Sequence, residues 1–292
     1  MNDLPRPIDT AHDTARDALP RLATLPALGD LWTGFSLPLR AWRLIRHTPA
    51  LRRRTLRMSL IALTAMAGLF VGLAFAAPAL VDALWPAPEA WYAVAAQLAL
   101  KLVSFAALFI IGANALPPLL LVPFTDPLSI ETERALGLAP PSDQSLSRTL
   151  RETWRGLSNM AARVVVFLLG HALLFPLNLV PGVGGLAWSI LSWVWTAFWI
   201  ALANLDIPMA RHLYRFEHAL GVFRRRKRLL FGFGAATLLL SGVPLLNAAF
   251  LPIAIVSATL LLRALIEAGE LPAPAPAAGE RDRAGRGELP RP

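Results

Sequence analysis

The chain contains no cysteine and only two lysines, Lys101 and Lys227. The absence of cysteine excludes a disulfide framework, a thiol nucleophile and a thiolate metal site. Charged residues make up only 16% of the sequence, hydrophobic residues 55%, and the mean hydropathy is +0.52. This composition is typical of a polytopic membrane protein.

Charge is also missing from long stretches of the chain. The longest, residues 164–205, has 42 residues without Asp, Glu, Lys or Arg, and a bilayer accommodates such a run far better than water does. Prolines and glycines interrupt it at the centre, and an interrupted helix at membrane depth needs protein or a water-filled cavity around it. This first break is either the turn of a helical hairpin or the lining of a conduction path, and its candidate residues are Pro176, Asn178, Pro181, Gly182 and Gly184.

Two other stretches predict full membrane crossings. Residues 58–81 are 24 residues without charge, or about 36 Å of helix at roughly 1.5 Å per residue. The second crossing is expected over residues 93–121, with Lys101 inside it and prolines 117 and 118 at its end. The connection between them contains acidic and aromatic residues but no Lys or Arg, which marks the outer side of the membrane. We expect Lys101 to snorkel towards that side; facing a cavity, it would attract anions.

The last charge-free stretch, residues 229–262, is broken by Gly242, Pro244 and Asn247. Each arm of about 14 residues would reach roughly 21 Å, less than the roughly 30 Å thickness of the hydrocarbon core. Arginines flank both ends, so both ends favour the cytoplasm. We therefore predict a re-entrant hairpin here, and the same for residues 164–205. Pairs of interrupted helices indicate a transport path, which adds Pro244 and Asn247 to the candidates.

Basic segments lie beside the apolar runs. Residues 34–47 and 206–228 combine helical apolar spacing with arginines on other faces, as expected of helices at the membrane interface. The positive-inside rule explains the net charge of +9 better than nucleic-acid binding does, and anionic lipids are expected partners of the basic segments. Residues 1–30 and 267–292 are rich in Pro, Ala and charge and are predicted to be disordered. The membrane domain is thus expected over residues 31–266, with both termini in the cytoplasm.

Two helix starts carry charged residues. Thr48 and Pro49 fit the cap and first position of the helix that contains Arg52 and Arg53. Asp126 followed by Pro127 predicts another start, with acidic residues 131 and 133 near the positive end of the helix dipole. The histidines have no metal-ligand spacing, and the glycine-rich break lacks the Lys and Ser/Thr of a phosphate loop, so no metal or cofactor is expected.

Several short pieces, in order, resemble the CysZ/etoposide-induced membrane protein family. The resemblance covers roughly residues 34–265. Each piece is weakly specific alone, whereas their order and spacing together are fairly specific. The pieces are Gly34-Phe35 with Trp42-Arg43-Leu44-Ile45-Arg46; Pro123-Phe124 with Pro127-Leu128 and Glu131; Val180-Pro181-Gly182-Val183-Gly184; Asp206-Ile207-Pro208; and Val243-Pro244-Leu245-Leu246-Asn247 with Leu251-Pro252-Ile253-Ala254.

The resemblance implies a bacterial inner-membrane sulfate permease that feeds cysteine biosynthesis. It also implies an all-α fold with two long transmembrane helices and two hemi-penetrating hairpins, and a homo-oligomer. The family's anion site, a Gly-Leu-Arg-Arg-like motif, matches Ala50, Leu51, Arg52 and Arg53, with alanine in place of glycine. Free amides at a helix N-terminus and two guanidiniums suit a tetrahedral dianion.

Alternatives remain open at this stage. Arg52 and Arg53 also suit contact with lipid phosphates, as basic residues beside membrane helices commonly do. The chain as a whole is either an anion permease or a non-transporting scaffold that organises other membrane components. An enzyme is not expected, because no nucleophile, metal or cofactor constellation is present. The sequence does not choose among sulfate and similar anions.

Overall fold

The computed structural model describes residues 17–20, 22, 27–85, 90–137, 146–242 and 244–272. Every regular element in these ranges is a helix, as the sequence predicted. The helices are α2 (Ala27–His47), α3 (Pro49–Leu84), α4 (Trp91–Ala135), α5 (Leu146–Leu174), a 3-10 helix (Phe175–Leu179), α6 (Gly184–Arg211), α7 (Phe216–Arg225), α8 (Lys227–Ser241) and α9 (Pro244–Glu267).

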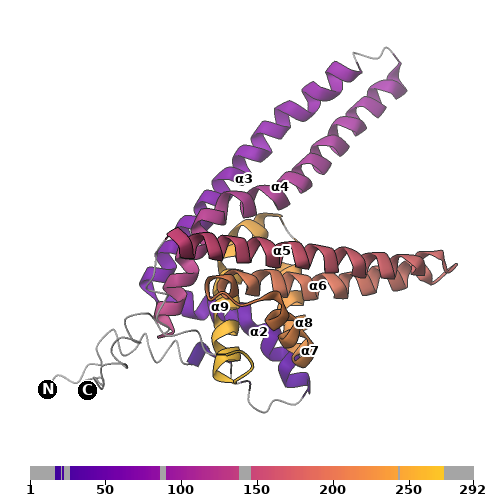
Figure 1. Ribbon diagram of the computed structural model, residues 1–292. Helices are drawn as coiled ribbons and strands as arrows, with labels where there is room; N and C mark the ends of the chain where they lie inside the picture. Colours follow the sequence, from indigo (N-terminus) through magenta and orange to yellow (C-terminus); the bar gives the residue numbers. More distant parts are fainter. Residues whose placement is uncertain are drawn as a thin grey trace, which may run out of the picture.

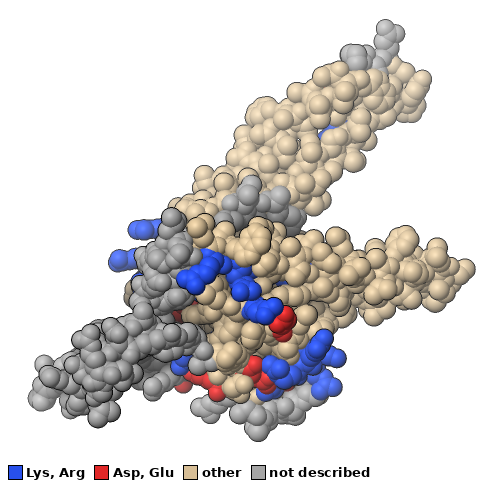
Figure 2. All heavy atoms as spheres, viewed as in Figure 1, with Lys and Arg blue, Asp and Glu red and all other residues tan. Residues whose placement is uncertain are grey.

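Two long helical hairpins project from a compact body in different directions (Figure 1). Helices α3 and α4 form one arm, and α5 and α6 form the other. On the face seen in Figure 2, charged atoms gather on the body, and the arms are almost free of them. Because the apolar side chains of the arms have little protein around them, the arms suit a lipid environment. We refer to them as the α3–α4 arm and the α5–α6 arm.

Five helical segments of the described chain are long and apolar enough to cross a membrane, which marks a multi-pass membrane protein. Four belong to the two arms, and their most apolar windows are at most 28% buried. The fifth, Phe250–Glu267 in α9, differs because 72% of its window is buried inside the protein. The α8–α9 hairpin thus lies within the body, with α8 only 15 residues long.

Close backbone contact holds the body together. Helix α8 packs against both α2 and α6, and glycines allow the approach. A Cβ on Gly34 would collide with the carbonyl oxygen of Leu229, and one on Gly232 with that of Leu31. Small residues at helix contacts are a main source of packing in membrane proteins, where lipid removes most of the hydrophobic driving force.

Ion pairs stabilise each arm. Near the base of the α5–α6 arm, Arg163 binds Asp206 at 3.0 Å, and Asn159 donates a hydrogen bond to the same carboxylate. Near the tip of the α3–α4 arm, Lys101 Nζ lies 2.6 Å from Asp82 Oδ1. Lys101 thus extends towards the connection at the tip, as the snorkelling interpretation predicted, and its charge is paired there.

The structure corrects two of the expected helices. Helix α4 does not end at prolines 117 and 118 but runs on through Pro123 and Pro127 to Ala135. One side of this segment, with Leu121, Leu128 and Ser129 fully buried, packs against α9 and α6, and this packing outweighs the missing proline amides. The basic segment 206–228 is not one helix: α6 ends at Arg211, Leu213 has a positive φ of 60°, and α7 and α8 follow.

The terminal segments differ in part from the expected disorder. Helix α2 begins at Ala27, inside the arm expected over residues 1–30, and both Ala18 and Leu22 are buried against the body. At the other end, residues 268–272 are also described, and Leu271 is 3% exposed. The remaining parts of the expected termini, residues 1–16, 21, 23–26 and 273–292, lie outside the described residues.

Candidate functional site

The predicted anion-binding motif lies at the first turn of α3. Pro49 is the first helical residue, as predicted, and Thr48 precedes it with extended backbone. The Thr48 side chain, however, makes no cap hydrogen bond, and its hydroxyl is buried without a partner in the described chain. Leu51 is fully buried in the core. Leu51 therefore anchors the turn, and only the two arginines after it are available to a ligand.

Arg52 and Arg53 are both exposed, but they point to different surroundings. Arg52 lines a cavity of about 590 Å³, whereas Arg53 does not. Successive residues on a helix are about 100° apart, so the pair does not form one fork. The cavity lies between α2, α3 and the α8–α9 hairpin, and its lining residues are Trp42, Ile45, Arg46, Arg52, Thr55, Leu56, Ser59, Leu240, Phe250 and Ile253.

The neighbouring Arg54 has a different role. Its Nη1 donates to the carbonyl oxygen of Pro127 at 3.1 Å, and its Nη2 lies 3.3 Å from Glu131. No Asp or Glu of the described residues forms an ion pair with Arg52 or Arg53. Arg54 therefore fastens α3 to α4, while Arg52 and Arg53 keep their charge available for an anion.

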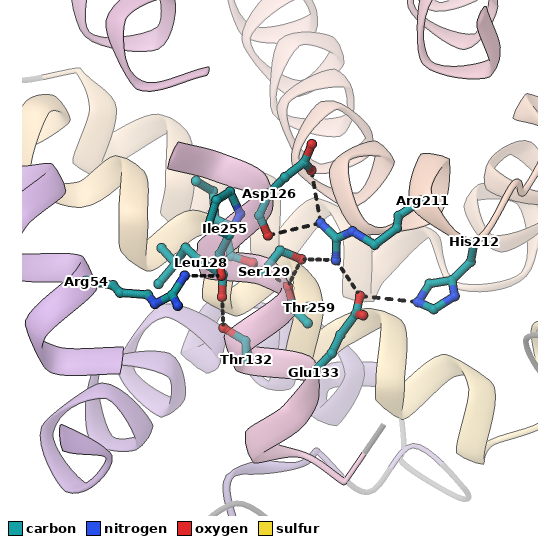
Figure 3. Close-up of polar contacts among 11 residues, drawn as sticks. Arg54, Asp126, Leu128, Ser129, Thr132, Glu133, Arg211, His212, Ile255 and Thr259 are labelled. Carbon is teal, nitrogen blue, oxygen red and sulfur yellow. Dashed lines mark hydrogen bonds and ion pairs between the residues drawn. The ribbon is translucent and has the colours of Figure 1, made fainter. Parts of the chain in front are cut away.

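A second polar centre, which the sequence did not predict, lies on the other face of the same α4 segment (Figure 3). Its members come from the end of α6 and from α4. Arg211 is 7% exposed, and its guanidinium lies 2.9 Å from Glu133 and 3.0 Å from Asp126. We call this group the Arg211 cluster; it consists of Asp126, Ser129, Glu133, Arg211 and His212.

The Arg211 cluster joins three helices. Arg211 also donates to Ser129 Oγ at 3.2 Å, and Ser129 exchanges a 3.0 Å hydrogen bond with Thr259 of α9. His212 Nε2 lies 3.2 Å from Glu133 Oε1 (Figure 3). Asp126 and Glu133 were expected to cap a helix start; they lie inside α4 instead and bind an arginine from α6.

The first turn of α3 and the Arg211 cluster differ in how their charges are paired. The side chain of Glu133 is fully buried, and its Oε2 atom has no partner among the described residues. Two carboxylates already occupy the guanidinium of Arg211, so an incoming anion would have to displace them. The buried Arg211–Glu133 ion pair links the end of α6 to α4. Arg52 and Arg53 form no such ion pairs with the described carboxylates.

The first break is confirmed as an interruption. The 3-10 helix Phe175–Leu179 follows α5, and a turn leads to the start of α6. Gly182 has a φ of +82°, and a Cβ on Gly184 would collide with the carbonyl oxygen of Leu177, so the turn requires both glycines. Pro176, Asn178 and Pro181 are exposed near the tip of the α5–α6 arm.

The second break lies elsewhere. Pro244 begins α9, and Asn247 is 8% exposed. Asn247 lies about one turn before Phe250, which lines the cavity next to Arg52. The structure therefore brings the second break near Arg52 and leaves the first break at the tip of an arm. One copy of the chain does not gather the two breaks along a single path.

Other histidines have local partners. His171 Nδ1 lies 3.2 Å from the carbonyl oxygen of Phe167. His218 Nδ1 accepts a hydrogen bond from the backbone amide of Arg215. No group of three or more potential metal ligands occurs within the described ranges.

A comparison with protein families agrees with this architecture. Residues 37–252 match the family described as sulfate transporter CysZ/etoposide-induced protein 2.4. The match includes the first turn of α3, the Arg211 cluster and both breaks. The chain therefore belongs to the CysZ/etoposide-induced protein 2.4 family.

Proposed function

We propose that the chain is a channel-like anion permease of the bacterial cytoplasmic membrane, with sulfate as its substrate and sulfur assimilation as its purpose. The family description names a sulfate transporter, and the five apolar helical segments fit a membrane carrier. The observation that carries the proposal is the position of Arg52 and Arg53. Both are exposed and free of carboxylate partners in the described chain, and Arg52 lines a cavity.

The chemistry of the first turn of α3 fits a tetrahedral dianion. A helix N-terminus carries partial positive charge and unpaired amides, and guanidiniums hydrogen-bond to oxyanions in a fixed geometry. Arg52 offers its charge from the cavity and Arg53 from outside it, so an anion could pass from one to the other. Such a transfer needs no cofactor.

We further propose that α3 and α4 are the full crossings and that both other hairpins are re-entrant. The charge-free part of α3 spans about 36 Å, enough for a hydrocarbon core of roughly 30 Å. Helix α8 has 15 residues, or about 22 Å, and is covered by protein. Its length and burial both support a half-penetrating α8–α9 hairpin.

The length of the α5–α6 arm supports the same assignment. Apart from Gly184 and Ser192, the buried residues of α6 begin at Ala197. The part of α6 that projects, residues 184–196, is therefore only about 20 Å long at roughly 1.5 Å per residue. This projecting part is shorter than the roughly 30 Å hydrocarbon core and does not cross it alone.

Single cysteines test this topology cleanly, because the chain has none of its own. Val183, 67% exposed near the tip of the α5–α6 arm, is one site, and Ala90, at the tip of the α3–α4 arm, is the control. With protein in sealed cells, an impermeant thiol reagent added outside should label Ala90→Cys and leave Val183→Cys unlabelled. Equal labelling of both would contradict a re-entrant α5–α6 arm.

Binding of labelled sulfate to the purified chain tests the anion site. We expect Arg52→Gln to weaken binding most, Arg53→Gln to weaken it less, and Arg57→Gln, an exposed arginine further along α3, to leave it unchanged. Loss of one charge-assisted hydrogen-bonding group corresponds to roughly 1.5–3 kcal/mol, or about 10- to 150-fold. Equal binding by all four proteins would remove Arg52 and Arg53 from the site.

The second candidate function is a non-transporting membrane scaffold. One observation favours it. The residues of the first break are exposed near the tip of the α5–α6 arm, so within a single copy of the chain they do not line a path. Under the permease proposal these residues line a path only when several copies assemble, so we also propose a homo-oligomer. A chain that is monomeric in native membranes and transports no anion would favour the scaffold.

A further inference from the structure

Helix α2 has three faces with different surroundings. Its buried face, with Leu37 and Leu44 fully buried, packs on the body. A second face is apolar yet exposed, with Trp32 at 69% and Trp42 at 44% exposure. The third face, beside the exposed apolar one, is basic. Indole rings concentrate where membrane and water meet, and a helix with adjacent apolar and basic faces is typical of the membrane surface.

A groove of about 460 Å³ opens along the basic face. Trp32 and Leu39 form its apolar side, and Asp17 and Ala18 come from the segment before α2. The groove is separate from the cavity beside Arg52, since no residue lines both. The polar and basic lining residues that α2 contributes are Ser36, Arg40, Arg43 and His47.

The charge inside this groove is not balanced. Arg40 Nε donates a 3.4 Å hydrogen bond to Ser36 Oγ, and no carboxylate of the described chain, Asp17 included, forms an ion pair with Arg40 or Arg43. Burial, and then the charge of Arg43, lower the pKa of Arg40 below its ordinary value. Two guanidiniums one helical turn apart, neither paired with a described carboxylate, repel each other, and an anion between them would relieve this repulsion.

We propose that this groove binds the phosphate head group of an acidic phospholipid. Arg40 and Arg43 hold the phosphate. Ser36 donates its hydroxyl to the carbonyl oxygen of Thr33 at 3.0 Å and accepts from Arg40 Nε, so it positions Arg40. The acyl chains continue past Trp32 and Leu39 along the exposed apolar face of α2. That apolar continuation is the reason to assign a lipid rather than a free anion, because inorganic phosphate would gain nothing from it. The site is independent of anion permeation.

The test titrates the purified full-length chain, in a non-ionic detergent, with three probes. These are short-chain phosphatidylglycerol, phosphatidylcholine with the same acyl chains, and inorganic phosphate, each followed by isothermal titration calorimetry. The variants are Arg40→Gln/Arg43→Gln, Arg40→Lys/Arg43→Lys, and the matched control Arg224→Gln/Arg228→Gln. Arg224 and Arg228 are exposed and line neither cavity.

We expect the parent chain to bind phosphatidylglycerol more tightly than either other probe. Loss of both arginines should weaken that binding about thirtyfold, the lysine variant should keep most of it, and the control should match the parent. The glutamine variant should fold normally, because it removes a repulsion. Unchanged affinity in the glutamine variant would overturn the site. Equal binding of inorganic phosphate or of phosphatidylcholine would overturn its assignment to an acidic lipid.

Discussion

Replacing Arg211 with methionine should destabilise the protein far more than the same change at Arg54. Arg211 is 7% exposed, and its partner Glu133 is fully buried. Methionine keeps most of the side-chain volume, so the main effect is a buried carboxylate without its cation. Breaking a buried ion pair on one side costs about 3–5 kcal/mol.

Arg54 provides the matched control, because it binds the same segment of α4 from the outside. Its side chain is 42% exposed, and that of its partner Glu131 is 21% exposed. An ion pair with this much water around it is worth at most about 1 kcal/mol. Arg54→Met should therefore cost about a third or less of what Arg211→Met costs.

A third variant separates lost charge from lost packing. Adding Glu133→Gln to Arg211→Met removes the uncompensated carboxylate, so we expect the double variant to recover at least about 2 kcal/mol relative to the sum of the single changes. Urea unfolding in detergent, followed through the nine tryptophans, measures the parent, the three single variants (Arg211→Met, Arg54→Met and Glu133→Gln) and the double variant. Equal costs at Arg211 and Arg54, or simple additivity in the double variant, would refute the assignment of a buried, structural ion pair.

Three further predictions concern packing and titration. Gly232→Ala should lower the free energy of unfolding by about 1–3 kcal/mol, because the added methyl group separates α2 from α8. The control is Gly72→Ala, which should stabilise α3 slightly because Gly72 has open space around it. Thermal unfolding compares the two variants. Burial raises the pKa of Tyr214 to about 12, so the phenolate absorbance that develops near pH 12 should be lost in Tyr214→Phe. The free energy of unfolding should fall as the pH rises from about 10, the usual tyrosine pKa, towards 12. Burial opposes ionisation of Glu270, but hydrogen bonds from Arg225 and Arg226 outweigh it and lower the pKa of the carboxyl; the stability lost in Glu270→Gln at pH 7 should therefore shrink as the pH falls below about 4.

The elements that depend on local chemistry could be predicted from the sequence. The charge-free runs predicted the two arms and the α8–α9 hairpin, because only lipid or protein can surround so many apolar side chains. The start of α3 followed from Thr48 and Pro49, and the first break followed from prolines and glycines whose backbone effects act at their own positions. These features need no knowledge of distant parts of the chain.

The Arg211 cluster could not be predicted in the same way, because its partners come together only in the folded chain. Arg211 and Glu133 are 78 positions apart, and Asp126 before Pro127 looks locally like a helix start. In the fold, packing by α6 and α9 carries α4 through that proline. One signal was available: charged residues near membrane helices usually pair with one another, which points to Asp126, Glu133 and Arg211 without choosing the pairs.

Uptake of labelled sulfate into liposomes tests the central claim most directly. The liposomes would contain the parent chain, the Arg52→Gln/Arg53→Gln variant or the Arg57→Gln control, each verified as folded. The proposed permease predicts uptake above empty liposomes for the parent and the control, and little or none for the double variant. Parent uptake no greater than that of empty liposomes would contradict sulfate permeation, and full uptake by the double variant would contradict the proposed anion site.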